Sequence, residues 1–154
     1  MRTLYNSDFY AWTQEQARLL KETKWDLVDV VNLIEEIETL GRQERKELRN
    51  RFGVLIGHLL KWQYQPKNRS NSWLATIREQ RRKIEMLLQE SPSLQPHLEE
   101  ALQTGYEDGV DLAVRETNLS YETFPETCSY TLEQVIEAKF LPDGKLSEPR
   151  SQIL

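Results

Sequence analysis

Cysteine is almost missing from this sequence, which contains Cys128 alone. One thiol cannot form a disulfide within the chain or supply the several thiolates of a structural zinc site. Long apolar runs are missing too, because no stretch approaches the roughly 18 consecutive apolar residues of a membrane span, and the first residues lack the apolar segment of a secretion signal. We therefore expect a cytoplasmic protein with no membrane segment.

The common catalytic motifs are also missing. The sequence has no Gly-x-x-x-x-Gly-Lys-Ser/Thr loop, no Gly-x-Gly-x-x-Gly and no Gly-x-Ser-x-Gly, which argues against nucleotide-binding and serine-hydrolase folds. Cys128 could pair with His58 or His97 as a nucleophile, but nothing around it would lower the thiol pKa, so we interpret it as structural. We assign no catalytic residue and expect no cofactor.

Charge is unevenly distributed along the chain. The net charge of -5 is made of -4 over residues 1–41, +9 over residues 42–83 and -10 over residues 84–154. A basic centre between acidic flanks can form a binding face, or it can pair with the flanks inside one fold. We favour internal pairing and keep the binding face as the alternative.

Apolar residues recur at helical spacing through most of the chain, and no segment alternates as a half-buried strand does. The pattern predicts an all-α fold, a single-domain bundle of about five to six helices over residues 1–141, with two or more long helices. N-caps are expected at Ser7 or Asp8 and at Ser70 or Ser72, and Thr131 with Gln134 has the form of a capping box. The polar tail, residues 142–154, is expected to be disordered.

A second helix is predicted to begin near Asp26. We favour its end at Gly41, where a third helix would begin, and keep one continuous helix bent at Gly41 as the alternative. Its apolar stripe, which we expect to be buried, has Leu33 and Leu40 at its edges and consists of Leu27, Val30, Val31, Ile34 and Ile37.

A fifth helix, from about Leu94 to Glu116, carries a ridge of small residues at every fourth position: Ala101, Gly105, Gly109 and Ala113. Glycine inside a helix costs about 1 kcal/mol relative to alanine, so two on one face indicate close packing of a neighbouring element. We expect that neighbour within the domain, and keep a homo-oligomer seam through Gly105 and Gly109 as the alternative.

The segment from residue 58 to residue 82 is basic and contains two tryptophans. Cations beside indole rings can bind phosphate groups or stacked bases, although the same side chains could instead be core anchors. The candidate binding patch consists of His58, Lys61, Trp62, Gln65, Arg69, Trp73 and Arg78.

A carboxylate and histidine site formed by Glu35, Glu38 and His58, with Lys61 nearby, is a further alternative that would make the chain an enzyme. Di-iron helical bundles use Glu-x-x-His pairs, and this sequence contains none, because Leu55 and Leu94 occupy the positions three residues before His58 and His97. We therefore predict no metal ligands.

Six runs in the sequence form one recognisable pattern of motifs: Asp8-Phe-Tyr-Ala-Trp12, Asn32-Leu-Ile-Glu-Glu-Ile-Glu38, His58-Leu-Leu-Lys-Trp-Gln-Tyr-Gln-Pro66, Ser72-Trp73, Thr76-Ile-Arg-Glu-Gln-Arg81 and Ser91-Pro-Ser-Leu94. On these runs the chain, from about Tyr5 to Pro142, resembles the bacterial family called domain of unknown function 29. The resemblance implies an all-helical domain, found mainly in cyanobacteria and other bacteria, with no assigned activity, cofactor or catalytic residue.

The function therefore stays open among three hypotheses. The first is a non-enzymatic helical module that binds another protein. The second is nucleic-acid or phosphorylated-ligand binding through residues 58–82, which the sequence pI of about 5.2 disfavours. The third is the enzyme with a carboxylate and histidine site.

Overall fold

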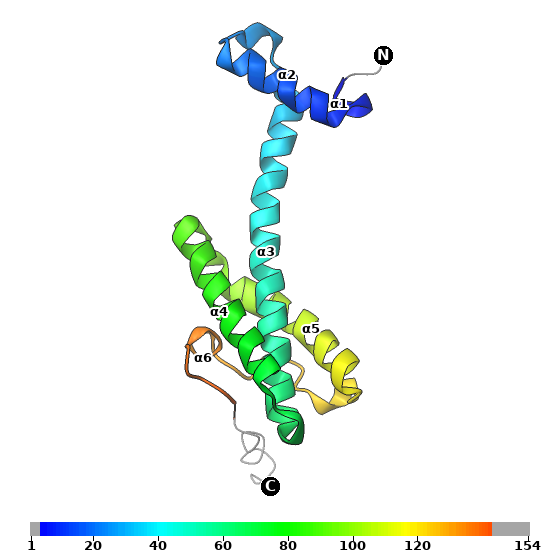
Figure 1. Cartoon of the computed structure of the whole chain (residues 1–154), viewed down its shortest axis with the longest axis vertical. Helices are drawn as coiled ribbons and strands as arrows, with labels where there is room; N and C mark the ends of the chain where they lie inside the picture. The colour runs from blue at the N-terminus through cyan, green and yellow to red at the C-terminus, as the bar shows by residue number, and fades with distance from the viewer. Residues whose placement is uncertain (1–3, 143–154) are drawn as a thin grey trace. The chain divides into compact units, whose positions relative to one another are not determined.

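The computed structural model describes residues 4–142, and it is helical with no strand in that range. Its α-helices are α1 (Leu4–Ser7), α2 (Phe9–Lys21), α3 (Val30–Tyr64), α4 (Asn71–Glu90), α5 (Leu98–Thr117) and α6 (Leu132–Ile136) (Figure 1). Short 3-10 turns join them at Trp25–Leu27, Pro66–Asn68, Pro92–His97 and Tyr121–Thr123. The all-α prediction is confirmed. The expected tail lies outside the described residues except for Pro142, which is buried.

The helix ends follow the local sequence signals. Asp8 caps α2 by accepting from the Ala11 amide, and Ser70 caps α4 by accepting from the Trp73 amide. Thr131 and Gln134 form the predicted capping box before α6, with both reciprocal hydrogen bonds present. These predictions are confirmed because capping depends on the few residues around each helix end.

The prediction that a helix ends at Gly41 is wrong, since α3 runs through this residue without interruption. A single glycine costs only about 1 kcal/mol in a helix. The residues after it, Arg42 to Glu47, are mostly strong helix formers with no proline or cap among them, so the helix continues.

The contacts divide the chain into two compact units, the first up to Gln43 and the second from Glu44, a division that the hydrophobic spacing does not predict. We call them the N-terminal and the C-terminal unit. Each is described separately below.

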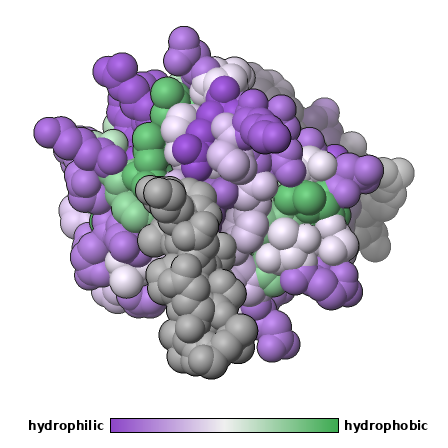
Figure 2. All heavy atoms as spheres, turned by 90° about the horizontal axis from the view of Figure 1, so that it is seen from below, coloured by the Kyte–Doolittle hydropathy of each residue, from purple (hydrophilic) through white to green (hydrophobic). Residues whose placement is uncertain are grey.

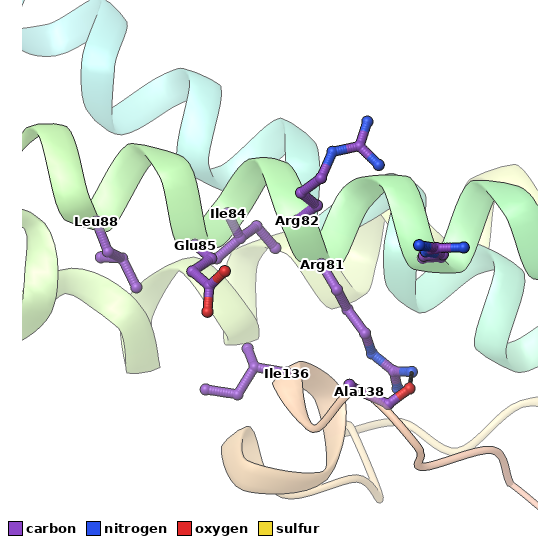
Figure 3. Close-up of a pocket in the computed structure, with 8 residues that line it drawn as sticks. Arg81, Arg82, Ile84, Glu85, Leu88, Ile136 and Ala138 are labelled. Carbon is purple, nitrogen blue, oxygen red and sulfur yellow. Dashed lines mark hydrogen bonds between the residues drawn. The ribbon is translucent and has the colours of Figure 1, made fainter.

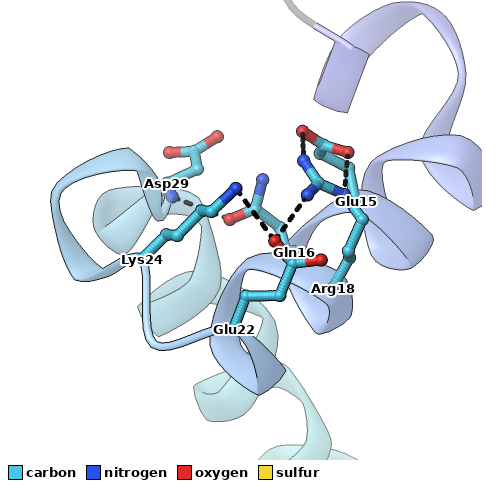
Figure 4. Close-up of polar contacts among 6 residues, drawn as sticks. All are labelled: Glu15, Gln16, Arg18, Glu22, Lys24 and Asp29. Atoms are coloured by element: carbon cyan, nitrogen blue, oxygen red, sulfur yellow. Dashed lines mark hydrogen bonds and ion pairs between the residues drawn. The ribbon is translucent and has the colours of Figure 1, made fainter.

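Among residues 4–43 of the N-terminal unit, the buried side chains are Trp12, Gln16 and Leu19. The Trp12 indole donates to the Asp29 carboxylate at 3.0 Å, and Gln16 accepts from the Asp29 amide at 2.7 Å. Exposed charges complete the unit, with Arg18 between Glu15 and Glu22 (Figure 4). Two buried apolar side chains are a small core for about 40 residues.

The C-terminal unit holds the main hydrophobic core. Its centre is the second half of α3, where Leu48, Phe52, Leu55, Ile56 and Leu59 are completely buried. Figure 1 shows α4 and α5 beside this part of α3. The face of the molecule seen in Figure 2 is mostly hydrophilic, and its hydrophobic residues lie in small separate areas.

Four glycines bring α3 and α5 into backbone contact. A Cβ added to Gly105 would lie 3.2 Å from the Gly53 nitrogen, and one added to Gly109 would lie 2.9 Å from the Gly57 nitrogen. The ridge predicted on α5 is buried, and its two glycines lie against α3 of the same chain.

Ion pairs join the same two helices. Arg45 pairs with Glu100 at 3.0 Å, and Arg49 with Asp108 at 3.2 Å. Basic residues of the central segment thus face acidic residues of the following segment, as the internal reading of the charge pattern expects. These pairs are exposed, and each contributes at most about 1 kcal/mol.

Candidate functional sites

Two cations of the basic, tryptophan-containing segment, Lys61 and Arg69, make contacts within the chain. Lys61 is 5% exposed, and its Nζ lies 2.5 Å from Glu116 and 4.6 Å from the centre of the Trp73 ring. Arg69 donates from Nε to the Trp62 carbonyl at 2.8 Å and lies 4.9 Å from the centre of the Trp62 ring. Each cation therefore lies over an indole ring and has a partner within the chain. The binding of Arg69 is incomplete, because its Nη2 is buried with no hydrogen-bond partner among the described residues.

The other members of the candidate binding patch have different settings. His58 is half-buried, and its Nδ1 donates to the Val54 carbonyl at 2.9 Å if that nitrogen carries the proton. Gln65 accepts from the Asn68 amide at 2.6 Å. Arg78 is exposed on α4, so the structure does not gather the seven predicted residues around one cavity.

Sequence reasoning missed Glu116, which belongs to the cluster around Lys61. It lies near the end of α5, and the hydrogen bond from Lys61 lowers its pKa. Burial lowers the pKa of the neighbouring His58, which favours the neutral imidazole at pH 7. The acidic character of residues 84–154 was the signal for such a partner, but it could not identify which residue.

The alternative site of Glu35, Glu38 and His58 is distributed over both units. Glu35 lies in the N-terminal unit and pairs with Arg42 at 3.2 Å, and Glu38 is exposed in the same unit. His58 belongs to the C-terminal unit, where its charged neighbours are Lys61 and Glu116. Within residues 4–142 no three His, Cys, Asp or Glu side chains are close enough together to hold a metal ion.

Cys128 is a half-buried free thiol whose sulfur lies 3.5 Å from the Tyr130 carbonyl. Burial raises its pKa, so the thiol form dominates at neutral pH. A raised pKa is the opposite of what an activated nucleophile needs.

Arg81 is the most highly connected cation of the C-terminal unit. Its guanidinium donates to the carbonyls of Gln134, Val135, Ala138 and Phe140 at 2.8 to 3.3 Å. Figure 3 shows the side chain of Arg81 pointing from α4 toward Ala138, and that of Arg82 pointing away from it. Arg81 therefore fastens the segment around α6 to α4.

A pocket of about 370 Å³ lies beside this contact. Ile84, Leu88 and Ile136 give it apolar walls (Figure 3), and Arg78 and Arg82 are its exposed cations. No ion pair within residues 4–142 involves Arg78 or Arg82. The exposed Glu85 lines the same pocket. Two guanidinium groups beside one carboxylate and an apolar surface leave an excess of positive charge that suits an anionic ligand.

The largest departure from the sequence prediction is on the first half of α3. The stripe that was expected to be buried is exposed, and only Leu33 is half-buried. The exposed fractions range from 51 to 78%. We call these six residues the apolar strip: Leu27, Val30, Val31, Ile34, Ile37 and Leu40.

Helical spacing shows that one face of a helix is apolar but does not show what covers it. Burial of the apolar strip was predicted on the assumption that the rest of the domain would cover it. Scattered apolar residues on a surface are normal, whereas a contiguous patch is typical of an interaction site. The apolar strip is thus the candidate interaction surface of the N-terminal unit.

No helix within residues 4–142 is both long enough and apolar enough to cross a membrane. No curated protein and no solved structure matches the chain. One family model matches residues 4–141, which is most of the sequence, and its description is "Domain of unknown function DUF29". The all-helical architecture, the long quoted runs and this match agree, and the chain belongs to the DUF29 family.

Proposed function

We propose that this chain is a non-enzymatic protein-interaction module of the cytoplasm, and that the apolar strip is its docking surface. The observation that carries the proposal is the exposure of six apolar side chains, five of them on the first three turns of α3 and Leu27 on the 3-10 turn before it. Helix recognition in proteins commonly uses apolar residues at this spacing. Cytoplasmic location is supported by the single, unpaired cysteine.

The composition of the N-terminal unit supports the same conclusion. Trp12 and Leu19 are its only fully buried apolar side chains among residues 4–43. Burying apolar area stabilises a fold by about 25 cal/mol per Å², so a partner seated on the apolar strip would add a large share of the stabilisation that this unit lacks.

Site-specific photocrosslinking tests this function. A photoreactive amino acid replaces Val31, which is 78% exposed, and in a matched control it replaces Gln89, an exposed polar residue of α4. Illumination of cells that express the full chain should give a discrete adduct from position 31 and none from position 89. If both positions give no adduct, or the same adducts, the apolar strip is not a docking surface.

A second candidate function is binding of a phosphorylated ligand at the pocket between α4 and α6. The unpaired cations Arg78 and Arg82 favour it. Because phosphate contacts release counterions, binding of a labelled oligonucleotide should weaken at least tenfold between about 50 and about 200 mM salt. It should also be lost in Arg78→Glu/Arg82→Glu. Salt-independent binding, or binding that this double variant retains, contradicts the second candidate.

A further inference from the structure

The apolar strip has the spacing of a two-helix seam. Val30, Ile34, Ile37 and Gly41 follow one another at intervals of four, three and four residues on α3, which is the pattern by which helices pair along one line. Leu33 and Leu40 lie beside this line. The face therefore has the form of one half of a helix pair.

Gly41 leaves a gap in this seam. It has no side chain, and a Cβ added to it would have nothing within 4 Å. Gly41 follows Val30 by about three helical turns. A helix lying antiparallel on α3 could place a branched side chain in this gap, and Val30 of a second copy has the position to do so.

One antiparallel register gives each of the four residues on this line a partner on the same line of the second copy. When Val30 of one copy lies on Gly41 of the other, Ile34 faces Ile37 and Leu33 faces Leu40. Each contact then occurs twice, as the two-fold symmetry of a homodimer requires. No polar side chain enters the central line in this register.

Charge at the two ends of the seam favours the same direction. Asp26 lies at its beginning together with Asp29, whose carboxylate already accepts from Trp12 and Asn32. Arg42 and Arg45 lie just beyond its end, with Glu44 between them. Antiparallel pairing sets the acidic end of one copy against the basic end of the other, whereas parallel pairing sets like charges together. The present ion pairs of Arg42 and Arg45 are exposed, so they can rearrange at little cost.

We propose that the apolar strip binds the same face of a second copy of this chain, forming an antiparallel homodimer through the first half of α3. This inference rests on the proposed function, because it names the partner for the same docking surface. The partner chemistry follows from the seam: branched aliphatic residues, a glycine gap and oppositely charged ends.

Disulfide trapping tests the register. Val30→Cys and Gly41→Cys are made separately in full chains that also carry Cys128→Ser. Position 30 is exposed and position 41 is unobstructed, so both accept a cysteine. Under mild oxidation the mixture of the two variants should form a disulfide-linked dimer, and each variant alone should form little. Strong crosslinking of Val30→Cys alone would show parallel pairing and overturn the proposal.

Sedimentation equilibrium tests the dimer itself. The unmodified chain should show twice its mass of 18.2 kDa at micromolar concentration. Ile37→Asp should lower the dimer fraction at least tenfold. Met86→Asp, a control at another exposed apolar residue on α4, should leave it unchanged. A monomer at all concentrations, or equal effects of both substitutions, overturns the dimer, and circular dichroism of each variant verifies that it is folded.

The two proposals fail in different ways. A photocrosslinked adduct of position 31 with a different protein, together with a monomer in sedimentation, overturns the homodimer and leaves the docking function in place. An adduct within the same chain, which does not increase the mass, overturns both. An adduct with twice the chain mass supports both.

Discussion

Gly109 of α5 lies directly against Gly57 of α3, so closely that a Cβ on Gly109 would be 2.9 Å from the Gly57 backbone nitrogen. The Gly53 carbonyl oxygen is 3.1 Å from the same point. Backbone atoms of a buried helix cannot move aside as a flexible side chain can. The contact therefore requires glycine at this position and fixes the distance between the two helices.

Gly109→Ala should destabilise the protein. Overpacking of a well-packed contact costs about 1–3 kcal/mol, and here it outweighs the propensity gain of replacing a helical glycine. Gly41→Ala is the matched control, because in the monomer its Cβ meets nothing within 4 Å, and at protein concentrations low enough to keep the chain monomeric it should stabilise by up to about 1 kcal/mol. Urea unfolding of both variants measures the two effects. Equal effects of the same sign would contradict the backbone contact.

Arg81→Lys should detach the segment around α6. A lysine ammonium has three donors on a flexible stem and cannot reproduce the planar fork that reaches four carbonyls. Leaving buried carbonyls unpaired costs about 1–3 kcal/mol each at most sites, so we expect a loss of about 2–4 kcal/mol.

Hydrogen exchange locates the effect of Arg81→Lys. Amides of residues 132–140 should lose protection while those of α5 keep it. Arg82→Lys serves as the control, since Arg82 is exposed on the same helix. Uniform loss of protection throughout the C-terminal unit would indicate general unfolding instead.

Stability should fall when the pH drops below about 6.5, the ordinary pKa of histidine. Burial lowers the pKa of His58 in the folded protein, so the unfolded chain binds the proton first and stability decreases until the folded pKa is reached. His58→Gln should remove part of this decrease in urea unfolding between pH 7.5 and pH 5.5, values about one unit on either side of that pKa.

We expect a second decrease in folding stability, at lower pH, from the protonation of Glu116. Its pKa is lowered by Lys61 in the folded state, so its contribution is present above its ordinary pKa of 4.5 and disappears as the pH falls through the folded value. Glu116→Gln should flatten the stability profile there. An unchanged profile would mean that the Lys61 contact contributes nothing to stability.

Leu48→Ala should lower the free energy of unfolding strongly and Ile37→Asp should hardly change it, although both residues are apolar members of α3. Leu48 is completely buried, and its truncation should cost about 2–5 kcal/mol. Ile37 is 59% exposed, so its substitution should change the stability of dilute monomer by less than about 0.5 kcal/mol. Urea unfolding at low protein concentration separates the effects of burial from those of association.

The same comparison shows how far sequence reasoning reaches. Leu48 and Ile37 have equivalent positions in the apolar pattern, and nothing in the pattern indicates that one is covered and the other is not. The caps at Asp8, Ser70 and Thr131 were predictable because their chemistry is local. Burial depends on which distant segment lies opposite, and that information is not contained in spacing.

For the candidate sites too, composition and spacing predict which residue types are present but not which distant groups they contact. Cations beside indole rings could be anticipated from the composition of residues 58–82. Their partners within the chain could not, because they depend on Glu116 and on the path of the chain after Trp62. The role of Arg81 was not predictable, because its partners are main-chain carbonyls. Every residue has one, so the sequence does not indicate which of them Arg81 contacts. The apolar strip was recognised as a pattern and was wrongly placed in the interior.

The hydrogen bonds of Arg81 to residues 134–140 are accepted by main-chain carbonyl oxygens, which every amino acid possesses. These hydrogen bonds are therefore independent of which side chains this stretch carries, provided that the path of its backbone is kept. Exposed positions such as Glu133 and Lys139 can be exchanged for tags, fluorophores or altered charge without breaking the hydrogen bonds of Arg81, whereas Glu137 carries a charge that acts on Arg81. A single side chain on α4 thus leaves this stretch open to redesign, and its own replacement is the change that the arrangement tolerates least.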